Sequence, residues 1–178
     1  MLGSMEFDLK DAEMQLGRMP EVLNSLVGQL PAEFQQARDG EETWSAFDVI
    51  GHLVHCEKAD WMVRARIILE YGEDKQFPPF DRFAQFRESE GKLIGELLGE
   101  FALLRKANLD SLRSLGLSSA DLDKTGIHPA FGQVSLRQLL ATWVAHDYGH
   151  LVQIARTLAR QYKQAVGPWA QYLSVMGK

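Results

Sequence analysis

Apolar residues recur at intervals of three and four positions along almost the whole chain, and no segment shows the strict alternation of a half-buried strand. This period predicts amphipathic helices over residues 6–30, 45–71, 81–115 and 135–162, with one shorter helix at 169–176. Four long amphipathic helices within 178 residues predict an all-α fold, a four-helix bundle with a short C-terminal helix.

Polar and helix-breaking residues mark where these elements begin and end. Ser45 followed by Asp48, and Ser135 followed by Gln138, have the spacing of capping boxes and predict two helix starts. Pro20 is expected to kink or restart the first helix, because proline lacks a backbone donor and clashes with the preceding turn. Loops are expected at 31–43, 72–80 and 117–134, the last with one helical turn from Ser118.

No repeat, low-complexity tract or linker divides the chain, so residues 5–178 are expected to form a single domain. Gly3-Ser4 before Met5 has the look of a cloning remnant and is left out of the fold prediction. The N-terminus shows no signal peptide and no apolar run approaches membrane-spanning length, which favours a cytoplasmic protein without membrane contact.

Composition narrows the class of protein further. Hydrophobic types make up 46% of the chain and charged types 24%, the ordinary balance of a globular domain. The 19 basic and 24 acidic residues give a net charge of −5 without a basic cluster, which argues against nucleic-acid binding. The single cysteine, Cys56, excludes an intrachain disulfide and a cysteine-rich zinc site.

The five histidines carry the chemical signal. His146 and His150 are four residues apart on a predicted helix, so both imidazoles leave the same face and can hold one ion. Either His52 or His55 of the second helix can supply a third ligand, and His52 fits better because apolar neighbours flank it. Three neutral imidazoles with one open position describe a catalytic zinc, nickel or iron site, whereas the alternative is ordinary core histidines with hydrogen-bond partners.

Several stretches match one known family in their family order over about residues 16–160. They are Trp44-Ser45 through Gly51-His52-Leu53 with Glu57; His128-Pro129 with Gly132 and Val134-Ser135-Leu136-Arg137; and Ala145-His146-Asp147-Tyr148-Gly149-His150-Leu151 with Gln153-Ile154. On these residues the sequence resembles the DinB/YfiT-like superfamily of metal-dependent four-helix-bundle proteins.

The resemblance implies a divalent metal held by His52, His146 and His150, and a frequent homodimer. Zinc or nickel is the first expectation, with iron or manganese as alternatives. Characterised relatives include transferases and isomerases that use a low-molecular-weight thiol, and metal-dependent hydrolases. A small-molecule substrate is expected for this chain. Arg64, Arg66 and Arg82 are candidates for binding the carboxylates of such a thiol cofactor.

The remaining histidines and the cysteine have competing interpretations. His128, in the long loop, is a candidate catalytic acid or base, although such a histidine more often ties a loop down. His55 is expected to be a solvated or interface residue. Cys56, one turn after His52, is expected to be a small core residue rather than a fourth ligand or redox-sensitive thiol.

Four further side chains are expected near the site. Asp48 either caps its helix or accepts a hydrogen bond from an imidazole, and Asp147 either braces a neighbour or faces the first helix. Glu57 is expected to form an outward salt bridge. Trp143, like the other tryptophans, is expected in the core or a dimer interface, with the pocket wall as an alternative.

Together these features predict a metal-dependent enzyme that activates water or a thiol for hydrolysis, transfer or isomerisation. The alternative is a non-catalytic, metal-binding or stress-related bundle dimer.

Overall fold

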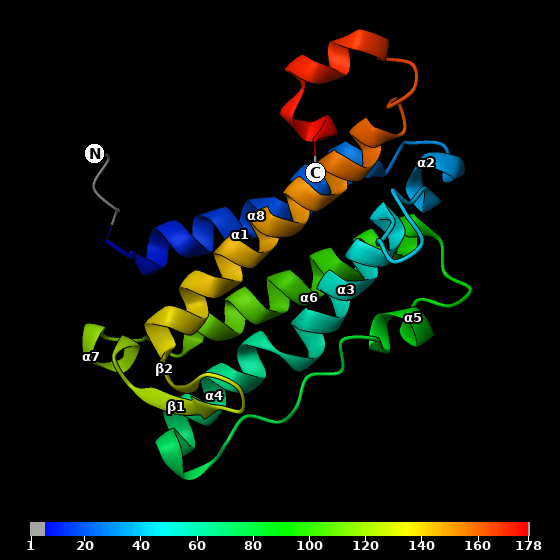
Figure 1. Cartoon of the computed structure of the whole chain (residues 1–178). Helices are drawn as coiled ribbons and strands as arrows, with labels where there is room; N and C mark the ends of the chain where they lie inside the picture. Colours follow the sequence, from blue (N-terminus) through cyan, green and yellow to red (C-terminus); the bar gives the residue numbers. More distant parts are fainter. Residues whose placement is uncertain (1–5, 178) are drawn as a thin grey trace.

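The chain folds around four long helical elements that pack lengthwise (Figure 1). The computed structural model describes residues 6–177, and the expected cloning remnant at Gly3-Ser4 lies outside them. The long elements are α1 (Leu9–Val27), α3 (Ala46–Ala59) followed directly by α4 (Trp61–Tyr71), α6 (Ile94–Ser114) and α8 (Leu136–Arg160). Helices α1 and α3 each pack against both α6 and α8, which closes the bundle. The predicted helical bundle is therefore confirmed.

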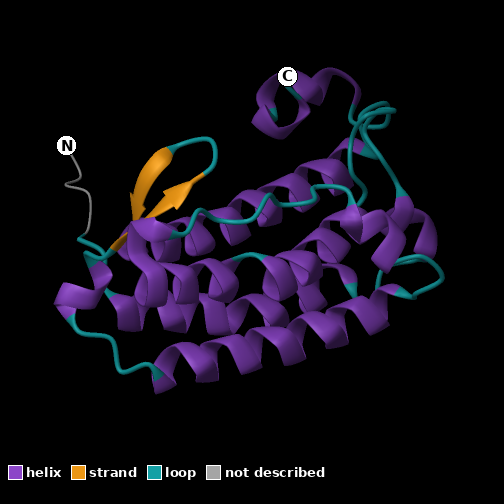
Figure 2. Ribbon diagram, turned by 90° about the horizontal axis from the view of Figure 1, so that it is seen from below, coloured by secondary structure: helices purple, strands orange, loops and turns teal. Residues whose placement is uncertain are grey.

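Short elements connect the long helices. They are α2 (Ala32–Gln36), the 3₁₀ turn η1 (Gly72–Asp74), α5 (Ala84–Glu88), α7 (Ser119–Leu122), β1 (Thr125–His128), β2 (Gly132–Ser135), and the 3₁₀ segments η2 (Gly167–Tyr172) and η3 (Ser174–Met176). Figure 2 shows the β1–β2 hairpin at one end of the bundle, while η2 and η3 lie beyond the other end (Figure 1). Among residues 6–177, no helix has the length and apolar character needed to cross a membrane.

The helix starts follow the predicted caps. The Ser45 hydroxyl accepts a hydrogen bond from the Asp48 backbone N–H, and the Asp48 carboxylate accepts one from the Ser45 N–H, forming a complete capping box. Ser135 and Gln138 repeat this arrangement at the start of α8. Capping is thus the role of Asp48, whose carboxylate also forms an ion pair with Arg38 at 2.8 Å.

Helix α1 runs through Pro20 without the expected restart. Proline cannot donate to the carbonyl four residues earlier, which leaves the Leu16 oxygen free. The buried guanidinium of Arg105 on α6 donates to that oxygen at 2.9 Å. The Arg105 side chain thereby supplies the hydrogen bond to the Leu16 carbonyl that the backbone nitrogen of Pro20 cannot donate.

Two of the predicted long helices are interrupted. The second breaks at Asp60, whose φ of −116° and ψ of −81° are not helical, and continues as α4. The third was expected to run without a break over 81–115, yet it is split into α5 and α6. Gly91 lies between these helices with φ +74°, a left-handed conformation that side-chain-bearing residues rarely adopt.

The β1–β2 hairpin was not expected from the sequence. Its antiparallel register pairs Thr125 with Ser135 and His128 with Gly132, and each strand has only four residues. Four residues are too few to show a clear alternation of polar and apolar positions. The hairpin packs closely on α4, since a Cβ at Gly126 would lie 2.9 Å from Ile68 Cγ1.

The short C-terminal helix expected from the sequence is present as two 3₁₀ segments. Trp169 and Tyr172 within it are exposed, so the segment buries no continuous apolar face that would stabilise an α-helix. Arg160 holds the tail through a hydrogen bond from its Nε to the Val175 carbonyl at 3.0 Å.

A layer of buried charge crosses the interior where two apolar clusters meet. One cluster contains Trp61, Leu112 and Trp143, and the other contains Leu23, Ile50, Phe101 and Ile154. Between them the Arg105 guanidinium binds the Glu57 carboxylate at 2.7 Å and the Asp147 carboxylate at 2.6 Å. Glu57 was expected to point outward; instead it is buried and also accepts from Trp143 Nε1 at 3.1 Å.

Candidate metal centre

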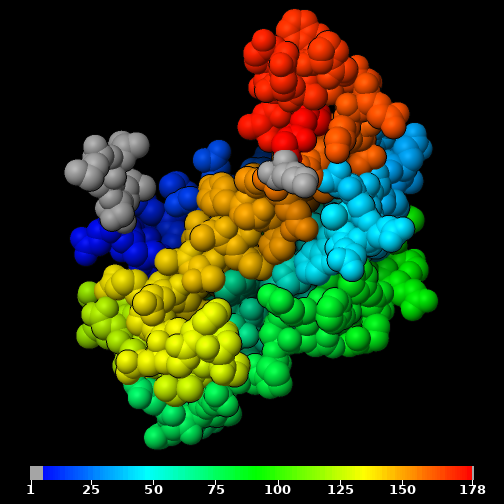
Figure 3. All heavy atoms as spheres, in the orientation of Figure 1, coloured from blue at the N-terminus to red at the C-terminus, as the bar shows by residue number. Residues whose placement is uncertain are grey.

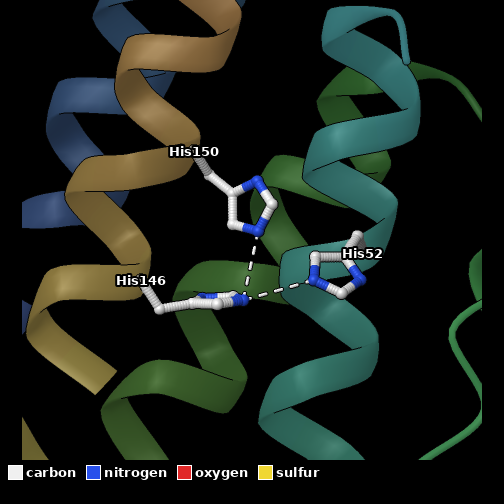
Figure 4. A group of neighbouring side chains, drawn as sticks. All are labelled: His52, His146 and His150. Atoms are coloured by element: carbon white, nitrogen blue, oxygen red, sulfur yellow. Dashed lines mark hydrogen bonds between the residues drawn. The ribbon is translucent and has the colours of Figure 1, made fainter. Parts of the chain in front are cut away.

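The three histidines selected from the sequence converge on one point between α3 and α8 (Figure 4). Their ligand atoms all lie within 4.8 Å of one another. The Nε2 atom of His146 is 3.3 Å from that of His52 and 3.1 Å from that of His150. Nitrogen ligands 2.0–2.1 Å from a tetrahedral ion are separated by about 3.3–3.4 Å. These two separations are close to that value and the third pair lies within 4.8 Å, so the three nitrogens can converge on one small divalent ion.

Burial keeps two of these imidazoles in the form that binds metal. Desolvation is the largest cause of the low pKa of His52, about 3, and the neighbouring histidines lower it further. The pKa of His150 falls to about 4, again mainly by burial. Both rings are therefore neutral at physiological pH, and each offers a lone pair to an ion.

Neighbouring groups orient the rings. Gln153 Oε1 lies 2.8 Å from His150 Nδ1, so Nδ1 carries the proton and Nε2 remains free to bind an ion. His52 packs against Trp44, with 4.9 Å between ring centroids. His146 Nδ1 is buried without a hydrogen-bond partner among residues 6–177, and an Asp147 carboxylate oxygen lies 4.0 Å from it. Through Asp147, the ligand cluster adjoins the buried Arg105 network.

A cleft of about 1100 Å³ opens beside the three histidines. Figure 3 shows the hollow between α8 with the hairpin on one side and the segment before α5 on the other. Six aromatic side chains line it: Trp44, Trp61, Phe77, Phe80, Phe83 and Phe131. Trp143 is fully buried in the core, one of the positions expected for it, and does not line the cleft; Trp61 of α4 stacks on it from the cleft side.

His128 lies in the wall of the same cleft, at the end of β1. Its Nδ1 accepts hydrogen bonds from the backbone N–H groups of Ala130 and Phe131 at 3.1 and 3.2 Å. The neutral ring therefore carries its proton on Nε2. Burial, with a contribution from Arg64, lowers the pKa of His128, which favours this neutral form. The structure thus gives His128 a loop-holding role and leaves one N–H able to donate.

Cys56 and His55 do not belong to the converging group of ligand atoms. Cys56 is buried, with its sulfur 3.4 Å from His52 Nε2, and desolvation raises the pKa of its thiol well above the usual range. His55 was expected to be a solvated or interface residue; it is not solvated but buried, and its Nδ1 lies 3.1 Å from Glu88 Oε1. Glu88 belongs to α5, so His55 ties α5 to α3.

Asp60 and Arg64 form an ion pair beside the site that was not predicted from the sequence. The break between α3 and α4 places both in the cleft wall, with Arg64 Nε 2.6 Å from Asp60 Oδ1. Burial raises the pKa of Asp60, while Arg64 opposes that effect. Their i,i+4 spacing on one predicted helix was the signal available in the sequence.

Comparisons with known proteins agree with the helical-bundle fold. The family model described as the DinB superfamily matches residues 15–154. The chain therefore belongs to the DinB superfamily.

Among solved structures, the chain is similar to YfiT from Bacillus subtilis, with a TM-score of 0.75 and 19% sequence identity. The match covers 90% of this chain and 92% of that one. YfiT is described as a probable metal-dependent hydrolase with an unusual four-helix bundle topology. No curated protein matches the chain.

The pKa values of the two buried imidazoles lead to a prediction for the metal-free protein. In the unfolded chain histidine titrates near pH 6.5, whereas His52 and His150 in the folded chain titrate near 3 and 4. At pH values between the folded and unfolded pKa, the unfolded state binds more protons than the folded state. The free energy of unfolding therefore has its full value above about pH 6.5 and falls as the pH is lowered. Urea unfolding in the presence of chelator should show this decline from pH 6.5 to 4.

The variant His150→Gln isolates this contribution, because glutamine does not titrate. Its free energy of unfolding should depend less steeply on pH in the same interval, while the contribution of the carboxylates remains. Equal slopes for the variant and the parent chain would contradict the prediction.

Proposed function

We propose that the chain is a divalent-metal-dependent hydrolase of small molecules, with His52, His146 and His150 as the metal ligands. The observation that carries this proposal is the convergence of three imidazole nitrogens beside an open, aromatic-lined cleft. Three protein ligands with one free position are typical of catalytic metal sites, whereas structural zinc sites have four protein ligands. Membership of the DinB superfamily and the description of YfiT support the same chemistry.

When bound, the ion would act as a Lewis acid and lower the pKa of a coordinated water. The chain's own residues have separate tasks. The Gln153 amide fixes the His150 tautomer, and the aromatic walls exclude bulk water from the reacting bond. His128 Nε2–H donates a hydrogen bond to a substrate oxygen or to a leaving group, since its Nδ1 is already engaged. His128 is therefore a hydrogen-bond donor in this proposal and not a base.

Thiol-dependent transfer is the second candidate, and the size of the cleft favours it. Pockets for one drug-sized ligand measure roughly 300–1,000 Å³. A cleft of about 1100 Å³ leaves room for a substrate and a low-molecular-weight thiol together. Of the three arginines proposed for such a cofactor, Arg64 and Arg82 line the cleft, whereas Arg66 instead donates to Ser111.

Elemental analysis and turnover together test the proposed function. Protein purified without a histidine tag and supplied with zinc or nickel should retain about one ion per chain, as one converging ligand set requires. It should then hydrolyse aryl esters or amides without added thiol, and chelation should abolish the turnover. Consumption of an electrophile only when a thiol is added would favour the second candidate.

Retention of one ion without turnover of either kind would contradict both enzymatic proposals and favour the structural or stress-related alternative. The homodimer and the cytoplasmic location expected from the sequence stay predictions. Analytical ultracentrifugation would check the oligomeric state.

A further inference from the structure

The cleft combines an apolar wall with arginines near the histidines. The rings of Trp44 and Phe80 both lie beside His52, at centroid distances of 4.9 and 5.9 Å. An aromatic or branched apolar group placed there would bury its surface against these two rings and end beside the metal ligands. The aromatic walls therefore favour a ligand whose main part is apolar, called its apolar body below.

Two arginines and two carboxylates are the charged side chains of the cleft wall, and one arginine is paired with one carboxylate. Two carboxylates line it, Asp60 and Glu42, and Asp60 is matched by Arg64 at 2.6 Å. Arg82 also lines the cleft, is exposed, and forms no ion pair with any carboxylate of residues 6–177. Arg82 and the three histidines line the same cleft, so a molecule bound there can meet the guanidinium and the ligand cluster together.

A divalent ion bound by the three histidines would give the cleft an excess of positive charge. Neutral imidazoles contribute no negative charge, so a divalent ion held by three of them keeps its full charge of about +2. Sites with carboxylate ligands would cancel part of that charge. An anionic group on the substrate is consequently favoured by both the ion and Arg82.

We propose that the cleft binds substrates that carry an oxyanion, a carboxylate or a phosphate, on an aromatic or branched apolar body. Arg82 receives the oxyanion, Trp44 and Phe80 hold the apolar body, and the reacting bond faces His52, His146 and His150. This inference deepens the proposed function and rests on it for the reacting bond. The role of Arg82 in binding does not require the metal.

Three probes of matched shape test the inference: phenylacetate, phenyl phosphate and the neutral phenylacetamide. Ligand-observed NMR titrations measure their affinity for the full chain, zinc-loaded and in the presence of chelator. We expect at least one of the two anions to bind about tenfold more tightly than the amide, which corresponds to ~1.4 kcal/mol. Arg82→Gln should remove most of that preference in the chelated protein and leave the affinity for phenylacetamide unchanged.

Arg66→Gln is the matched control, because Arg66 is also an exposed arginine yet lies outside the cleft. It should bind all three probes as the parent chain does. If Arg82→Gln keeps the full preference for anions, or if no probe binds, the inference is overturned. These failures differ from failure of the proposed function, which would appear as a chain that retains no zinc.

Discussion

Replacing Arg105 with methionine is expected to cost about 3–5 kcal/mol of the free energy of unfolding, the range measured when one partner of a buried ion pair is removed. The guanidinium is 1% exposed, and the carboxylates that it binds, those of Glu57 and Asp147, are equally buried. Methionine fills a similar volume, so the loss comes from two carboxylates left without their counter-charge. The Leu16 carbonyl would also lose its donor.

Urea unfolding of Arg105→Met beside Arg113→Met measures this effect. Arg113 lies on the same helix but pairs at the surface with Glu13 and Asp110, where removal of a charge costs under about 1 kcal/mol. Adding Glu57→Gln and Asp147→Asn to Arg105→Met should restore part of the lost stability, because the unpaired charges disappear. Equal losses for the two arginine variants, or no gain in the triple variant, would show that the network is not the cause.

The same network shows why sequence reasoning reached the ligands but not their surroundings. His146 and His150 share a helical face by spacing alone; apolar neighbours favoured His52 over His55 as the third ligand, and the family motif agreed. Arg105 meets Glu57 and Asp147 at separations of 48 and 42 residues, and no local pattern encodes such contacts. One signal was present: Arg105 lies four residues from both Phe101 and Leu109, on a stripe of apolar residues. A lone charge in that position indicates a buried partner.

The walls of the cleft were missed for a different reason. Trp61 and Arg64 enter the cleft because the chain breaks at Asp60, and periodicity continues across that break without interruption. The hairpin that brings His128 and Phe131 to the cleft is too short to show a strand pattern. Helix faces could therefore be predicted, whereas the positions of breaks and turns depend on tertiary contacts that the sequence does not show locally.

Replacing His52 with alanine is expected to weaken zinc binding by more than about 100-fold, since changes to outer groups that only orient a ligand already cost about 10–100-fold. His52 is the one converging ligand from α3, and the other two come from α8. Without His52, both remaining ligands lie on α8, and an ion bound to them is no longer held from α3. The large loss should be seen as a fall in retained zinc after competition with a chelator of known affinity.

Two neighbours on the same helix provide controls that separate ligation from proximity. His55→Gln removes an imidazole that binds Glu88 instead, and should keep the parent affinity. Cys56→Ser tests the sulfur 3.4 Å from His52 Nε2, whose raised thiol pKa disfavours the thiolate that metal binding needs. Cobalt-loaded parent protein should accordingly lack thiolate-to-metal charge-transfer absorption. If that absorption appears and Cys56→Ser removes it, the site has a fourth protein ligand, and the open position on which the proposed hydrolysis depends does not exist.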